Sequence, residues 1–266
     1  MQSRWVWNHW SVCRPARAPE FGALQDTSED LRLGPFDTLS IMSTPEPLIR
    51  PPVQRRSQAA LERVLTAGLE VLQEVGFEGF TLQEVSRRAR VSIGSIYARV
   101  PSREALILAI YDRAMEQILA EEDRISNASD LDSLAPRELV QTLVIEMANI
   151  MLGNADVLAV FMRRAAVDPE IWRRGAETSH IFANVFHETL LRHRDKLTHP
   201  EPKLAVDIAY RFVYCTLARR ITHGPTFESP RRVSDDALVR ELARAAADYL
   251  LGPRSRNPAD RQRRRR

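Results

Sequence analysis

The stretch that decides the fold spans residues 76–113 and reads GFEGFTLQEVSRRARVSIGSIYARVPSREALILAIYDR. Within it, Thr81 is followed three residues later by Glu84. This is the spacing of a capping box, in which each of the two side chains satisfies an orphan amide of the other residue. A short helix is therefore expected from Leu82 to Ala89.

A second short helix follows a two-residue connection. Ser92 is a suitable N-cap for it, and the helix is expected to run to about Arg99. Pro101 prevents simple continuation, and Ser102 caps the next helix. The apolar residues of the two short helices have spacings that let them converge on a small core: Leu82, Val85, Ala89, Val91 and Ile96. The pattern predicts a helix-turn-helix whose second helix is free to enter a major groove.

Helical patterns also flank this motif. From Ser57 to Val75 apolar residues recur at three- and four-residue spacing, and Gly76 supplies a C-terminal stop. A long apolar-periodic run, residues 103–125, leads out of the motif. The remaining patterns are also helical and cover about 136–152, 155–165, 168–174, 178–196, 203–223 and 234–251. The expected fold class is all-α, with an N-terminal three-helix helix-turn-helix domain and a helical C-terminal domain.

The two ends of the chain have a different composition. Residues 1–53 lack periodicity and are interrupted by prolines, which is typical of a disordered leader. The polar stretch that begins at Met42 leads us to expect the physiological start there. Residues 253–266 are rich in arginine and lack apolar residues able to form a core, so a disordered tail is expected.

Net charge does not by itself indicate a nucleic-acid partner. The chain carries a formal charge of +3, but residues 254–266 hold seven arginines and one aspartate, a contribution of +6, so the rest stands at −3. DNA binding must therefore rest on a localised motif. No apolar stretch approaches the roughly 18 residues of a membrane helix, and the N-terminus lacks the apolar segment of a signal peptide. We expect a cytoplasmic protein without a membrane partner.

The second short helix has the residues of a DNA-reading surface. Its small side chains permit close approach to base edges: Ile93 or Ala98 can pack on a thymine methyl, and Ser95 can donate to a base or phosphate. The hydroxyl of Tyr97 suits a phosphate oxygen. The expected DNA-contacting residues are Arg56, Thr81, Ser92, Ile93, Gly94, Ser95, Tyr97, Ala98, Arg99 and Arg103. Thr81 and Arg103 are included because they begin helices, where the dipole favours an anion.

Taken one by one, these residues also fit an ordinary helical bundle, in which Thr81 and Ser92 are simple caps and Tyr97 is half-buried. Taken together, residues from about Arg56 to Arg113 closely resemble the DNA-binding domain of TetR-family regulators. The positions that fit the family pattern are Gly76, Phe77, Thr81, Val91, Ser92, Gly94, Ser95, Ile96, Tyr97, Ser102, Glu104 and Leu106.

Three positions depart from that pattern. Arg90 stands where the family often has Gly, Arg103 replaces the usual Lys, and Arg99 lies in the usual Tyr-x-Tyr/His-Phe ending. The resemblance implies a homodimeric, one-component repressor that binds a palindromic operator and is released by a small molecule. The operator sequence cannot be borrowed from a relative, because Arg99 changes the chemistry at the edge of the groove.

The resemblance further implies a helix-turn-helix domain over residues 54–113 and a ligand-binding and dimerisation domain over 114–252. Methionine and aromatic side chains adapt to apolar ligands, although core packing is the alternative for each. The candidates for lining an effector site are Met115, Leu119, Met147, Met151, Phe161, Met162, Trp172 and Phe182. The expected dimer contacts, on helices 178–196 and 203–223, are Ile181, Val185, Phe186, Leu190, Ile208, Phe212, Val213 and Leu217.

Enzymatic and metal-binding functions find little support. His187 and Glu188 begin a zinc-protease motif, but position 191 is Leu where a second His is needed. His180 and His187 lie two turns apart, yet an exposed or interface pair is the better interpretation. No metal, cofactor or catalytic residue is therefore expected. The remaining alternative is a helical protein-interaction module with degenerate DNA binding, against which the retained Thr81, Tyr97 and Arg103 argue.

Overall fold

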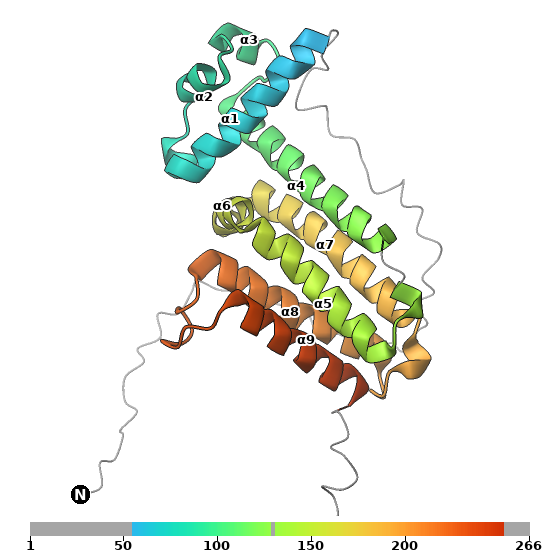
Figure 1. Ribbon diagram of the computed structural model, residues 1–266. Helices are drawn as coiled ribbons and strands as arrows, with labels where there is room; N and C mark the ends of the chain where they lie inside the picture. Colours follow the sequence, from blue (N-terminus) through green and yellow to red (C-terminus); the bar gives the residue numbers. More distant parts are fainter. Residues whose placement is uncertain (1–54, 129–130, 253–266) are drawn as a thin grey trace, which may run out of the picture. The chain divides into compact units, whose positions relative to one another are not determined.

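A computed structural model describes residues 55–128 and 131–252 of the chain. Within these two ranges every regular element is a helix and no strand occurs, which confirms the all-α prediction (Figure 1). The expected leader, the proposed start at Met42 and the arginine-rich tail lie outside the described residues.

The helices in chain order are α1 (Arg55–Gly79), α2 (Leu82–Ala89), α3 (Ile93–Tyr97), α4 (Arg103–Ala128), α5 (Pro136–Gly153), α6 (Ala155–Ala165), α7 (Pro169–Leu191), α8 (Pro202–His223) and α9 (Asp235–Leu251). A short 3₁₀ turn at Leu131–Ser133 precedes α5, and another at Arg194–Lys196 follows α7. In the described part of the chain, no single helix has both the length and the apolar character to cross a membrane; α5 and α6 meet those criteria only together, as a pair bent by 82°.

Glycine has opposite effects in two of these helices. Gly76 adopts φ 68° and kinks α1 at the predicted stop, after which one more helical turn continues to Gly79. In contrast, the predicted break between residues 174 and 178 is wrong, because α7 runs unbroken through Gly175. Ion pairs from Arg173 to Glu170 and Glu177 span this stretch one turn apart and offset the weak helix propensity of the glycine.

Two apolar cores hold the helices together. The first joins α1–α4 and reaches α6 and α7; its side chains buried to 2% exposure or less include Leu72, Phe80, Ile96, Leu106 and Ile110. The second joins α5, α7, α8 and α9. The boundary expected near residue 113 falls inside α4, which continues without interruption past it. The buried side chains of α4 belong to the first core, so a displacement of α4 is felt there.

Aromatic contacts connect α6 to the first core. The ring of Phe161 meets Phe77 edge-on at 6.1 Å and Tyr111 at 5.0 Å between centroids. The guanidinium of Arg164 lies 4.9 Å from the centroid of the Phe77 ring and pairs with Glu78 at 3.1 Å. The C-terminal turn of α1 and the middle of α4 are thus both packed on α6.

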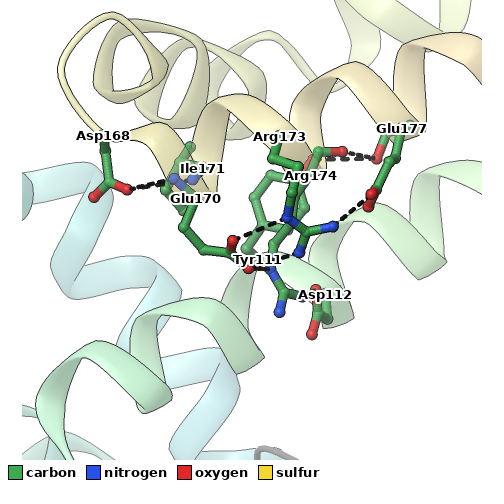
Figure 2. Close-up of polar contacts among 9 residues, drawn as sticks. Tyr111, Asp112, Asp168, Glu170, Ile171, Arg173, Arg174 and Glu177 are labelled. Carbon is green, nitrogen blue, oxygen red and sulfur yellow. Dashed lines mark hydrogen bonds and ion pairs between the residues drawn. The ribbon is translucent and has the colours of Figure 1, made fainter. Parts of the chain in front are cut away.

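Polar contacts connect α7 to α4 in the same region (Figure 2). Arg174 of α7 donates to Glu170, at 2.7 Å, and to Asp112 of α4. The Tyr111 hydroxyl lies 3.1 Å from that of Thr178. Hydrogen bonds from Arg173, together with those from Arg174, lower the pKa of Glu170 to about 2, so this carboxylate is charged at neutral pH.

Candidate nucleic-acid interface

Helix α2 is capped and then fastened to α1. The Thr81 hydroxyl accepts from the Glu84 amide at 3.3 Å, as expected of an N-cap. The reciprocal half of the capping box is not formed, because the Glu84 carboxylate accepts from Arg87 and Arg88 instead. These bonds, the one from Arg87 foremost, lower the pKa of Glu84 to about 2. Arg88 also donates to Glu74 at 2.7 Å, which joins α2 to α1.

The turn between α2 and α3 contains a non-glycine residue in left-handed backbone. Arg90 has φ 52° and ψ 45°. The Val91 amide donates to Ser86 O at 3.2 Å, and the Ser86 hydroxyl donates to Val91 O at 2.7 Å. The Arg90 side chain is exposed and forms no hydrogen bond or ion pair with the part of the chain that the structure describes. The family's usual glycine is thus replaced at a position whose backbone favours glycine.

Helix α3 is shorter than expected, since it ends at Tyr97, and it carries one fully buried side chain, Ile96. Ser92 caps it by accepting from the Ser95 amide at 3.3 Å. The opposite side of the helix is open to solvent. Its exposed residues are Ser92, Gly94, Tyr97 and Ala98, with 53% of Tyr97 accessible. A small, partly apolar surface therefore faces outward, whereas Ile93 is only partly accessible and packs against the first core.

Two of the three arginines expected to contact DNA, Arg99 and Arg103, form hydrogen bonds within the protein. Arg99 donates to the Ser57 hydroxyl at 2.6 Å and to Ser95 O at 3.1 Å. Arg103 donates to Phe80 O at 3.0 Å and to Phe77 O. Its guanidinium also lies 5.7 Å from the centroid of the Phe80 ring. The Arg56 side chain lies outside the part that the structure describes, so its expected DNA contact stays a prediction.

The expected effector-site residues fall into three groups. Met115, Met147, Met151 and Phe161 are buried in the two cores. Met162 and Phe182 are half-buried, and Phe182 packs against both cores. Leu119 is half-buried in α4. Trp172 is 63% exposed beside the buried Ile171, and we therefore withdraw it as a lining residue.

Half of the expected dimer contacts are core residues. Phe186, Leu190, Val213 and Leu217 are at most 3% exposed within one chain, so they cannot contact a second copy. Ile181 and Ile208 are exposed, whereas Val185 and Phe212 are half-buried. The apolar periodicity of α7 and α8 led us to place buried residues at the dimer interface. Each of these helices buries one apolar stripe in its own chain and exposes a shorter apolar segment on its other side.

Polar groups inside the helical region were not expected from the sequence. The Tyr210 hydroxyl donates to Ser179 O at 2.9 Å, and burial raises the pKa of Tyr210 above its ordinary range. Burial likewise raises the pKa of Tyr111 to about 12. In the sequence, only the four-residue spacing of Glu170 and Arg174 indicates one of these polar contacts. The contacting residues on α4 and α8 are too remote in sequence to be predicted.

Two capped short helices with an exposed second helix define the chain as a helix-turn-helix protein of the DNA-binding class. The sequence profile described as "Bacterial regulatory proteins, tetR family" matches residues 64–110, which run from α1 through α3 into α4. The match assigns the helix-turn-helix region, residues 64–110, to the TetR family of bacterial regulatory proteins.

The chain is similar to the HTH-type transcriptional repressor KstR of Mycolicibacterium smegmatis, with 28% identity over 120 residues. The match covers 45% of this chain and 56% of that repressor, so it spans little more than half of the relative's length.

Solved structures with the same fold cover more of the chain. A TetR transcription regulator from Haloarcula marismortui is similar at TM-score 0.58 and 16% identity, over 73% of this chain and 99% of that one. A transcriptional regulator from Rhodococcus sp. Rha1 is similar at TM-score 0.53 and 20% identity, over 72% and 95%. These likenesses extend the fold through the C-terminal helices.

Proposed function

We propose that the chain is a transcriptional repressor that binds a palindromic DNA operator as a homodimer and is released by a small molecule. The observation that carries this proposal is the outward face of α3, where Ser92, Gly94, Tyr97 and Ala98 are exposed while Ile96 anchors the helix. The similarity to the repressor named KstR, over 120 residues, supports repression as the direction of regulation.

The chemistry of this face suits a major groove. No atom lies within 4 Å of a Cβ built on Gly94, so the backbone of α3 is unobstructed on that side. Ala98 can pack on a thymine methyl, and the hydroxyls of Ser92 and Tyr97 can donate to phosphate or base oxygens. Because so few bases are within reach of one five-residue helix, useful specificity requires a second copy and an inverted repeat.

A second copy of the chain suits the outward face of α7 and α8. The exposed residues on this face are Ile181 on α7 and Leu204, Ile208 and Cys215 on α8. The three α8 residues follow one another at intervals of about one and two helical turns, so they lie on one side of the helix. This set replaces the four buried residues in our interface prediction. Helices packed about a two-fold axis would cover the apolar side chains and form a four-helix contact.

The effector is proposed to bind where the two cores meet. Phe182 packs against both cores, and Met115 and Phe161 of the first core and Met147 of the second belong to the neighbouring helices. A ligand that favours a different separation of α4 and α7 would displace α3, since α4 begins shortly after it. Binding must differ between the two states for release to follow.

Selection of genomic fragments with the purified protein, at a stated salt concentration, tests the proposed function. We expect the wild-type protein to enrich fragments that share an inverted repeat. At the same protein concentration, Tyr97→Ala should recover none of these fragments. Enrichment without a shared sequence, or equal enrichment by the variant, would instead favour a helical interaction module. A thermal-shift screen of apolar small molecules, with Phe182→Ala as the comparison, then tests the effector site.

A further inference from the structure

Arginine side chains connect α2, the end of α3 and the beginning of α4 to α1. Arg88 of α2 bonds to Glu74, Arg99 at the end of α3 bonds to Ser57, and Arg103 of α4 bonds to the Phe77 carbonyl. Side chains that would otherwise be natural phosphate ligands are thus used within the fold. Their roles in DNA binding need to be assigned one by one.

Arg99 has the most revealing geometry of the three. Its two terminal nitrogens donate to separate acceptors, Ser57 Oγ at 2.6 Å and Ser95 O at 3.1 Å. Ser57 lies in the first turn of α1, 42 positions away, whereas Ser95 lies within α3 itself. The guanidinium is half-buried between the two helices. One planar side chain therefore joins α3 to the beginning of α1.

Helix α3 needs such a connection. It contains five residues, and an isolated helix of that length does not persist in water. Its only fully buried side chain is Ile96, and the partly buried Ile93 packs against the first core beside it. The Arg99–Ser57 bond adds a polar restraint at the C-terminal end of α3, next to the buried Val100.

We propose that Arg99 is a positioning residue of the recognition helix: it acts on operator binding through its bonds to Ser57 and Ser95 and not by contacting a phosphate. The assignment rests on the proposed DNA-binding function. It replaces the expectation that Arg99 itself faces the groove. It also gives the uncharged Ser57, which was not among the expected DNA-binding residues, a role in placing α3.

The two roles predict different effects of substitution. A phosphate contact releases counterions, so its loss reduces the slope of log affinity against log salt by about 0.9 per contact. A positioning bond changes affinity without changing that slope. Lysine can replace arginine at a phosphate, but its single ammonium lacks the planar fork that reaches Ser57 and Ser95 together.

Operator affinity over a series of salt concentrations separates these cases for Arg99→Ala, Arg99→Lys, Ser57→Ala and the double variant Ser57→Ala/Arg99→Ala. We expect each single variant to weaken binding on the order of tenfold, with no change in slope. The double variant should be no weaker than Arg99→Ala. A slope reduced by about two per dimer in Arg99→Ala, with full affinity in Arg99→Lys and Ser57→Ala, would overturn the proposal.

Hydrogen exchange of the backbone amides in α3 provides a readout that needs no DNA. Arg99→Ala and Ser57→Ala should speed exchange across Ile93–Tyr97 alike, by about tenfold. Arg87→Ala removes the same charge from α2, where its bonds stay within the helix, and should leave α3 unchanged. Unaltered exchange in both Arg99 and Ser57 variants would reject the positioning role. If the wild-type chain binds no operator, the proposed function fails while this measurement still decides the role of Arg99.

Discussion

The guanidinium of Arg174 in α7 donates a hydrogen bond to the carboxylate of Asp112 in α4, across 62 positions of sequence. Only 11% of the Arg174 side chain is exposed, and Glu170 occupies another of its nitrogens. Figure 2 shows the three charged groups side by side, with Tyr111 next to them. Because α4 begins at Arg103, six residues after α3 ends, this pair helps to set where α3 lies relative to α7.

Removing Asp112 should therefore destabilise the protein measurably. Asp112→Ala leaves a nearly buried guanidinium with one partner fewer, and we expect unfolding free energy to fall by about 1–2 kcal/mol. Urea denaturation measures the loss. Glu70→Ala is the matched control, since Glu70 is exposed in the middle of α1 and has no bonded partner among the described residues. Equal stability of the two variants would contradict the importance of the Arg174–Asp112 bond.

Arg90→Gly should stabilise the chain. The left-handed backbone of Arg90, φ 52°, favours glycine, so relief of strain should raise the unfolding free energy by about 0.5 kcal/mol even after the entropy lost by glycine. The thermal midpoint tests this. Arg87→Gly, in the helical backbone of α2, should have the opposite sign, with a loss of about 1 kcal/mol. A lower midpoint for Arg90→Gly would show that its side chain contributes a contact that outweighs the strain.

Ile208→Asp should prevent dimerisation without unfolding the chain. Ile208 is 39% exposed in one chain, and a charge there would be desolvated against the second copy. Light scattering coupled to gel filtration should give a monomer. Val167→Asp introduces the same charge at a residue 73% exposed outside this face and should leave the dimer intact. A wild-type monomer, or a dimer that survives Ile208→Asp, would place the interface elsewhere.

Acidification should weaken the fold through His187. Burial lowers the pKa of His187 below 6.5, although Asp207, 3.6 Å from Nε2, opposes the shift and Arg211 adds to it. The unfolded chain therefore binds the proton first as pH falls, and stability drops from about pH 6.5 downward through the folded pKa. His187→Gln should reduce the pH dependence of the thermal midpoint between pH 7 and 5. His180→Gln, at an exposed position on α7, should not; identical profiles for the wild type and His187→Gln would refute the assignment.

The elements that the sequence predicted well are those decided by local chemistry. Thr81 and Ser92 cap α2 and α3 because a hydroxyl and an amide three residues later interact within one turn. Gly76 kinks α1 where it was expected to end it, because only its own backbone is involved. The break placed near Gly175 was wrong because ion pairs along α7 outweigh one unfavourable residue.

The roles that the sequence could not assign depend on long-range choices. Apolar periodicity marks Phe186 and Val213 as buried, but it does not distinguish burial in their own chain from burial against a second copy. A cation near the groove is equally suited to a phosphate or to a protein acceptor. Arg99 donates to Ser57, 42 positions away, and this pairing becomes visible only once the helices are packed together.

The central claim, that the outward face of α3 reads DNA, is tested most directly by footprinting the selected operator with wild-type protein and two variants of Tyr97. Wild type should protect an inverted repeat, Tyr97→Ala should lose the protection, and Tyr97→Phe should retain part of it by keeping the ring. Protection that is unchanged in Tyr97→Ala would show that another surface binds the DNA and would contradict the account.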